Sequence, residues 1–153
     1  MQSTSITFVE PTEVATILRL QQESNSLRIT RILDVRDDDF AGGHIRGCIH
    51  IPCWDLLSPQ PLSKSEEHGT TATALDMFIE EYCGRDVTER IVCHCYLSQQ
   101  RGPMAARRIA ERLEQLQDTG KYILPSDVCV LKHGWRRFVR IYGTEDDLVE
   151  GLP

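Results

Sequence analysis

The chain has 153 residues, with 17 basic against 23 acidic side chains and a formal net charge of −6. A chain of this length buries about two-thirds of its unfolded surface, so a collagen-like chain, a disordered chain and a miniature disulfide scaffold are all excluded. The acidic balance repels long polyanions such as DNA, and we therefore expect no nucleic-acid partner.

Short apolar runs alternate along the chain with stretches of helical spacing, which is the pattern of βα units around a buried, mostly parallel sheet. We therefore predict a single α/β domain over residues 1–153, with a core of about residues 6–143 and an acidic tail, residues 144–153, that docks only loosely. A segment rich in Pro, Ser, Thr and charge, residues 58–73, is predicted to form a surface loop. In chain order the predicted elements are a helix at 11–22, strands at 31–35 and 48–51, a helix at 72–82, a strand at 90–94, a helix at 103–116, a strand at 128–131 and a helix at 135–142.

The first residues, MQSTSITFVEP, contain neither a basic stretch nor an apolar one, and no later run approaches the roughly 18 apolar residues of a membrane helix. We expect a soluble protein without a secretory signal, located in the cytoplasm or, alternatively, in the nucleus, with no membrane partner. In a reducing compartment the six cysteines are expected to be free thiols.

The most informative stretch is IVCHCYLSQQRGP, residues 91–103. An apolar strand leads directly into Cys95, and after five further residues Arg101 precedes Gly-Pro and a strongly amphipathic helix. Proline suits the first turn of a helix, because its missing N–H would have no partner there. The loop of residues 95–101 therefore lies between the carboxyl end of a strand and the N-terminus of a helix, where an open α/β sheet usually binds its ligand.

A loop of this kind favours an anion. Backbone N–H groups converge on its centre, the helix N-terminus adds partial positive charge, and Arg101 can donate two hydrogen bonds to a tetrahedral oxyanion. The same field stabilises a thiolate at Cys95, and Ser98 is expected to donate its hydroxyl hydrogen to that thiolate or to the loop backbone. The residues predicted to bind the oxyanion are Tyr96, Leu97, Ser98, Gln99, Gln100 and Arg101.

A thiolate at this position supports two reactions. It can attack phosphorus in a phosphomonoester, displace the alcohol or phenol and leave a cysteinyl-phosphate for water to hydrolyse. It can instead attack arsenic in arsenate, leaving an adduct that a second thiol reduces. We therefore predict a cysteine-dependent enzyme that acts on a phosphoprotein or a small oxyanion, with Cys95 as the nucleophile and Arg101 as the oxyanion clamp.

Three ordered motifs, which together span most of the chain, resemble one family. His94, Cys95, five further residues and Arg101 resemble the active-site loop of the rhodanese-fold arsenate reductases and of their relatives, the cell-cycle dual-specificity phosphatases. LDVRDDDFAGGHIRG, residues 33–47, resembles the rhodanese signature around the first long strand. LKHGWRRF, residues 131–138, resembles the segment that follows the last core strand in these proteins.

The resemblance implies a rhodanese fold, in which a central, mostly parallel sheet is flanked by helices. It implies a phosphatase of the protein-tyrosine or dual-specificity type, or a reductase of arsenate or antimonate that uses glutathione and glutaredoxin as reductants, with no bound cofactor. Rhodanese sulfurtransferases typically carry a six-residue loop, whereas the loop from Cys95 to Arg101 has seven, so sulfur transfer is a minor alternative. A non-catalytic rhodanese-like binding module is the other alternative.

The chain departs from these relatives at three positions. Gln100 stands where the phosphatases have a glutamate, so the loop offers no carboxylic acid to protonate a leaving group. Val35 stands where those relatives place a protective cysteine, and His133 stands where glycine is common, which predicts strain if that turn needs a positive φ. Three other cysteines are left as unranked candidates for a disulfide with Cys95: Cys48, Cys53 and Cys93.

The remaining polar residues have structural interpretations with functional alternatives. Asp34 is predicted to be a hydrogen-bonded structural residue and Asp39 to pair with Arg36, whereas the alternative is that one residue of the run 37–39 protonates a leaving oxygen. His94 is expected to support the base of the loop, and no metal is expected, because a Cys-His-Cys run on a strand points its side chains to opposite faces.

Two basic clusters either face solvent or steer anionic substrates: Arg107, Arg108 and Arg112, and Arg136, Arg137 and Arg140.

Overall fold

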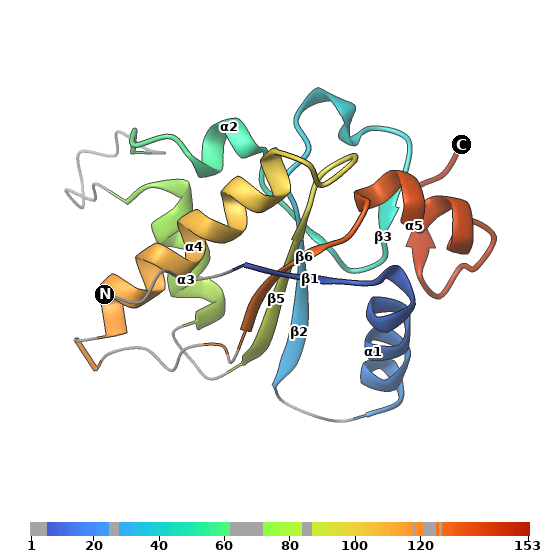
Figure 1. The fold of residues 1–153 in the computed structure, drawn as a ribbon, viewed down its shortest axis with the longest axis horizontal. Coiled ribbons are helices and arrows are strands. Elements are labelled where there is room, and N and C mark those ends of the chain that lie inside the picture. Colours follow the sequence, from blue (N-terminus) through green and yellow to red (C-terminus); the bar gives the residue numbers. More distant parts are fainter. Residues whose placement is uncertain are drawn as a thin grey trace.

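A five-stranded sheet forms the centre of the molecule (Figure 1). In the computed structural model, the residues described are 6–24, 28–61, 72–83, 87–117, 119–120, 125 and 127–153. All neighbouring strands of this sheet run parallel, which confirms the predicted α/β class. The spatial order of the strands is β1 (Thr7–Val9), β6 (Asp127–Leu131), β5 (Thr88–His94), β2 (Ile29–Asp34) and β4 (Ile49–His50).

Helices cover both faces of the sheet, because successive side chains of each strand point to opposite sides. Leu33 and Ile91 belong to the core on one face, and their neighbours Ile32 and Val92 belong to the core on the other. The two cores are therefore built from alternating residues of the same strands. The helices on the first face are α2 (Cys53–Leu56), α3 (Ala74–Cys83) and α4 (Arg101–Gln117), and those on the second are α1 (Pro11–Glu23) and α5 (Gly134–Tyr142) (Figure 1).

The acidic tail is docked, so the prediction of a loose tail was wrong. Strand β7 (Val149–Glu150) pairs antiparallel with β3 (His44–Ile45), and Leu148 is completely buried in the second core. Arg19 of α1 forms ion pairs with Glu145 and Asp147. Burial of two apolar side chains together with these charge contacts outweighs the acidic composition on which the prediction rested.

Short elements had no predicted counterpart. β1 and α2 span only three and four residues, which is too few for either hydrophobic period to be recognised. The longer elements lie where the sequence placed them, with ends shifted by no more than two residues, as at α4. Within the predicted surface loop of residues 58–73, residues 62–71 lie outside the described part of the chain.

Three loops leave the carboxyl edge of the sheet beside one another. Residues 35–43 follow β2, residues 95–100 follow β5 and residues 132–133 follow β6. Since β5 lies between β6 and β2 in a parallel sheet, its loop is flanked by the other two. Of the helices described, none combines the length and apolar character needed to cross a membrane.

Candidate functional site

Cys95 follows β5, the middle strand of the three that carry the site. Its side chain is only 3% exposed, and its Sγ accepts a hydrogen bond from the backbone N–H of Ser98 at 3.2 Å. The N–H of Cys95 in turn donates to Ser98 Oγ at 3.4 Å. The Ser98 hydroxyl therefore accepts a hydrogen bond from the loop backbone while the Ser98 N–H contacts the sulfur, and the expected donation of the hydroxyl hydrogen stays a prediction. Ser98 adopts a φ of 54° in this tight turn, a strained backbone of the kind that gathers at functional sites.

The N-terminus of α4 closes on the loop. A Cβ added at Gly102 would lie 3.3 Å from the Cα of His94 and 3.4 Å from Ser98 Oγ, so a larger residue there would press on the loop. The first unpaired N–H groups of this 17-residue helix therefore add their partial positive charge beside the loop that carries Cys95.

The residues predicted to bind an oxyanion all lie in this loop or at the start of α4. The carbonyl of Gln100 accepts the N–H of Met104 at 2.9 Å, which begins the hydrogen bonding of α4. The side chains of Tyr96 and Leu97 are 41% and 37% exposed, and Gln99 is exposed as well. These side chains point away from the core, so only their backbone N–H groups are available to form a cradle.

The beginning of α5 supports the other side of the loop. The N–H of Trp135 donates to the Cys95 carbonyl and the N–H of Arg136 donates to the Tyr96 carbonyl, both at 3.0 Å. Gly134 makes this contact sterically feasible, because its φ is +64° and an added Cβ would lie 2.5 Å from the Tyr96 carbonyl oxygen. The strain expected at His133 is present, since its φ is 65°.

His94 lies beneath the loop and is completely buried. Its Nδ1 is 3.1 Å from the Cys95 carbonyl oxygen, which can only accept, so Nδ1 carries the proton in this tautomer. Its Nε2 lies 3.6 Å from Asp34 Oδ2, too far for a hydrogen bond. Burial lowers the pKa of His94 against the opposing effect of Asp34, so the ring is neutral at neutral pH.

Asp34 and Arg36 form a buried ion pair under the site, with side chains 0% and 1% exposed. Arg36 Nη2 lies 2.8 Å from Asp34 Oδ2, and its Nε contacts both carboxylate oxygens. The guanidinium also lies over the rings of Phe40 and Trp135, at 5.1 and 4.9 Å from their centroids. The structural role of Asp34 is confirmed. The predicted side-chain pair between Asp39 and Arg36 was wrong, because Arg36 contacts only the carbonyl oxygen of Asp39.

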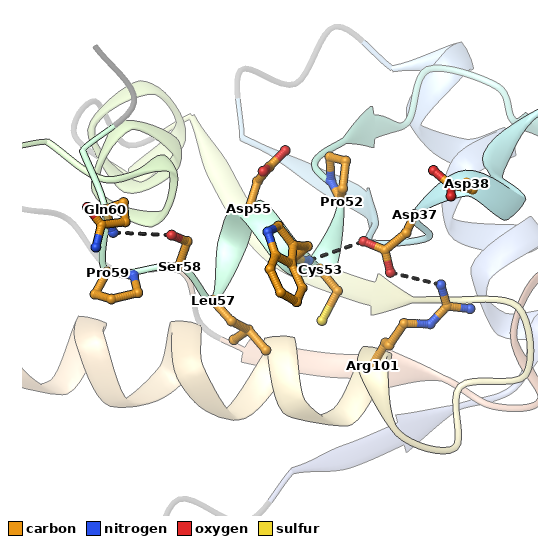
Figure 2. A pocket seen from close by; sticks show the side chains of 11 residues that line it. Asp37, Asp38, Pro52, Cys53, Asp55, Leu57, Ser58, Pro59, Gln60 and Arg101 are labelled. Atoms are coloured by element: carbon orange, nitrogen blue, oxygen red, sulfur yellow. Dashed lines mark hydrogen bonds and ion pairs between the residues drawn. The ribbon is translucent and has the colours of Figure 1, made fainter. Parts of the chain in front are cut away.

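The carboxylate of Asp39 binds Arg101 instead. Two parallel contacts join Arg101 Nη1 to Asp39 Oδ1 at 2.9 Å and Nη2 to Oδ2 at 2.7 Å, and Nη1 also contacts Asp37 Oδ2 at 3.1 Å (Figure 2). Hydrogen bonds from Arg101 lower the pKa of Asp39 from 3.8 to about 2. The residue expected to clamp an oxyanion is thus occupied by two carboxylates of the neighbouring loop. The acidic run was visible in the sequence, but its partner was not.

A groove of about 1020 Å³ opens beside this ion pair. Asp37 and Arg101 form one end, Cys53 and Leu57 line the middle, and residues 58–60 form the far end (Figure 2). Asp37 connects the two parts, because its Oδ1 accepts the backbone N–H of Trp54 at 3.1 Å. This groove was not predicted from the sequence, because α2, which lines it, was not predicted either.

All six cysteines are free thiols, and the three candidate redox partners have different surroundings. Burial raises the pKa of Cys48 to about 12 and that of the fully buried Cys93 further still. Burial raises the pKa of Cys53, and so does the charge of Asp37, whereas Arg101 lowers it; Cys95 raises it most weakly. Cys53 is therefore the candidate whose electrostatic surroundings include Cys95, whereas a disulfide between them stays a prediction.

The two basic clusters differ in their contacts. Arg112 Nε binds Asp76 at 3.0 Å, which ties α4 to α3 and favours the structural interpretation for that residue. Arg136, Arg137 and Arg140 are exposed on α5, whose first N–H groups hold the loop carbonyls.

Known proteins with similar sequences are phosphatases by name. The chain is 27% identical over 154 residues to the CDC25-like phosphatase YCH1 of Saccharomyces cerevisiae, covering 98% of this chain and 93% of that protein. It is 29% identical over 130 residues to the dual specificity phosphatase ibp1 of Schizosaccharomyces pombe, covering 78% and 81% of the two chains. Among solved structures, the As-Sb reductase of Leishmania major superposes with a TM-score of 0.66 at 26% identity, covering 93% of this chain and 82% of the other.

The family profile of the rhodanese-like domain matches residues 14–140. This range begins within α1 and ends within α5, so it contains the central strands β2, β5 and β6 and every loop of the site described above. The chain therefore belongs to the rhodanese-like domain family.

Proposed function

We propose that this protein is a cysteine-dependent phosphatase that hydrolyses phosphomonoesters of the phosphotyrosine type. The observation that carries the proposal is the Ser98 N–H donated to the Cys95 sulfur, in a loop that ends at Arg101 and the N-terminus of α4. A hydrogen bond to sulfur and the helix terminus both stabilise a thiolate. The phosphatase names of two relatives support the same reaction.

The reaction follows from these groups. The phosphate enters the loop, and the guanidinium of Arg101 exchanges the Asp39 carboxylate for two phosphate oxygens. The Cys95 thiolate forms a bond to phosphorus as the ester P–O bond breaks, and the phenolate that leaves takes a proton from water. Water then attacks the cysteinyl-phosphate, the S–P bond breaks, and the thiolate is restored while phosphate departs.

An aromatic leaving group suits this site best. The pKa of Asp39 is 3.8 in an ordinary environment and about 2 beside Arg101, so Asp39 is ionised at neutral pH before and after Arg101 turns to the phosphate, and it donates no proton to a leaving oxygen. Gln100 carries no proton of suitable acidity in the loop. A phenolate leaves more readily than an aliphatic alkoxide because the phenol is the stronger acid, which favours phosphotyrosine-type esters.

Arsenate or antimonate reduction is the second candidate, because the As-Sb reductase from Leishmania major shares the fold. The same thiolate would attack arsenic, and glutathione with glutaredoxin would supply the two electrons that reduce it. No bound cofactor is needed in either reaction. We place this activity second because the groove beside Arg101 is lined by aspartates, which repel the net negative charge of glutathione.

The test gives the purified protein an aryl phosphate in one assay and arsenate with glutathione, glutaredoxin and an NADPH-linked readout in another. We expect aryl phosphate hydrolysis that is lost in Cys95→Ser and reduced by about 100-fold or more in Arg101→Lys. The matched control is Cys83→Ala, which removes the thiol at the end of α3. We expect this variant to retain activity. Turnover of arsenate alone would replace the proposal with the second candidate, and no turnover of either would leave the binding-module alternative.

A further inference from the structure

The groove beside Arg101 is much larger than an oxyanion requires. Its volume of about 1020 Å³ equals that of pockets which enclose an entire drug-sized ligand. It begins at the Asp37–Arg101 ion pair and continues across α2 to residues 58–60 (Figure 2). A substrate whose phosphate is bound by Arg101 therefore places the atoms next to its phosphorylated side chain in this groove.

The charge of the groove is negative on one side. Asp38 and Asp55 both line it and both are exposed. Figure 2 shows their carboxylates along the same upper side of the groove. Asp37, in contrast, is already engaged by Arg101 and by the Trp54 N–H. Within the described part of the chain, the carboxylates of Asp38 and Asp55 have no hydrogen-bond or ion-pair partner, so they are available to a ligand.

Trp54 adds an aromatic surface to the same groove. Its side chain is 83% exposed, the largest exposed fraction among the large hydrophobic side chains described. Its backbone is nevertheless fixed, because its N–H is bound by Asp37 at 3.1 Å at the start of α2. An exposed indole on a held backbone, beside carboxylates, is the combination that binds an ammonium or guanidinium group, through the ring face and through charge-assisted hydrogen bonds.

We infer that this groove binds the peptide segment adjoining the phosphorylated residue, and that Trp54, Asp38 and Asp55 select a lysine or arginine side chain within it. The inference rests on the proposed function and specifies its substrate as a phosphoprotein with a basic residue near the phosphorylated tyrosine. Charge complementarity favours this occupant over glutathione, because two carboxylates outnumber one ammonium group in that tripeptide.

The experiment compares three sets of phosphotyrosine peptides of equal length. The residues beside the phosphotyrosine are lysine and arginine in the first set, glutamine in the second and glutamate in the third. Phosphate release gives kcat/KM for each peptide and for an unextended aryl phosphate. We expect the basic peptides to exceed the glutamate peptides by about tenfold at low salt, from one cation–π contact and one exposed ion pair. The preference should shrink at high salt, because exposed charges are screened.

Variants assign the preference to the groove. Trp54→Ala and the double variant Asp38→Asn with Asp55→Asn should each reduce the preference from about tenfold to about threefold, while kcat/KM for the aryl phosphate stays unchanged. Trp54→Phe should restore part of it, because a phenyl ring still presents an aromatic face. Asp146→Asn is the matched control, since Asp146 is an exposed carboxylate that does not line the groove.

The outcomes separate this inference from the function on which it rests. If aryl phosphate is hydrolysed without discrimination between basic and acidic peptides, the inference is overturned and the phosphatase proposal stands. If aryl phosphate is not hydrolysed, the phosphatase proposal fails. The groove is then judged by fluorescence anisotropy of labelled peptides on Cys95→Ser, where tighter binding of basic peptides supports it, and equal binding or displacement by glutathione overturns it.

Discussion

Arg36 and Arg101 each form a two-point ion pair with an aspartate, and the two pairs lie in opposite surroundings. The side chains of Arg36 and Asp34 are 1% and 0% exposed, whereas those of Arg101 and Asp39 are 30% and 40% exposed. A buried guanidinium cannot lose its partner without leaving an unpaired charge in the core. A half-exposed guanidinium can exchange a carboxylate for another anion at little cost. The first pair therefore holds the loops in place, and the second can exchange its carboxylate for another anion.

Asp34→Ala should have the largest effect on this comparison. It leaves Arg36 charged and unpaired in the core, and we expect the free energy of unfolding to fall by about 3–5 kcal/mol. Asp39→Ala removes the same atoms from the exposed pair and should cost about 1 kcal/mol or less. Urea denaturation followed by circular dichroism measures both, and equal losses in the two variants would show that the pairs do not differ as their burial indicates.

Gly134→Ala tests how tightly the buried side of the loop is packed. The new Cβ would lie 2.5 and 2.6 Å from the carbonyl oxygens of Tyr96 and Cys95, so we expect a loss of about 2–3 kcal/mol in unfolding free energy together with most of the activity. Gly120→Ala is the matched control, because Gly120 has a φ of +66° with nothing within 4 Å of an added Cβ. A loss no greater than that of the control would contradict the packing argument.

Asp39→Asn should raise the affinity of the site for anions. Without the Asp39 carboxylate, Arg101 keeps only its contact to Asp37, and an exposed pair worth about 0.2–1 kcal/mol corresponds to an inhibition constant for inorganic phosphate that is lower by about 1.4- to fivefold. Competition against aryl phosphate hydrolysis measures this constant. A weaker inhibition by phosphate would mean that Asp39 orients Arg101 for binding and does not compete with the anion.

The exposed pair should also contribute to the pH dependence of stability. The pKa of Asp39 is lowered from 3.8 to about 2 by Arg101, so its contribution is fully present above pH 3.8 and is lost as the pH falls through about 2. The difference in unfolding free energy between the wild type and Asp39→Asn should therefore shrink as the pH is lowered from 4 to 2. Denaturation curves over this range provide the measurement, and a constant difference would exclude the ion pair as its cause.

His133→Gly should have the smallest effect. Its φ of 65° costs about 1 kcal/mol or more for a non-glycine residue, but glycine also gains entropy in the unfolded state. The two terms nearly cancel, and we expect stability to rise by less than about 1 kcal/mol. Thermal unfolding of the variant measures this gain, and a clear loss of stability would show that the imidazole makes a stabilising contact.

The site was predictable as far as it is contiguous in the chain. The strand, the loop of residues 95–100 and the helix after it follow one another, so hydrophobic period and the Arg-Gly-Pro junction were enough to place Cys95 and Arg101 at the edge of the sheet. The contacts that cross between loops were not predictable. The predicted partner of Asp39 was Arg36, three residues away, whereas its carboxylate binds Arg101, 62 residues away.

Contacts between residues distant in the sequence also explain why α2 was not predicted and why the tail was predicted wrongly. α2 forms only four residues and carries no period of its own, yet it supplies Cys53 and Trp54 to the groove. The tail is acidic in composition, yet its residues Leu148 and Val149 are buried in the second core. In both segments a few side chains acquire their role from partners that are distant in the sequence.

By itself, the sequence determined the α/β class, the order of the long elements and the position of a thiol and an arginine at the carboxyl edge of the sheet, because each depends on residues close together in the chain. Only the tertiary structure decided which charges pair, which backbone group contacts the Cys95 sulfur and where the groove opens. Those features depend on burial, and burial is a property of elements that meet only when the chain has folded.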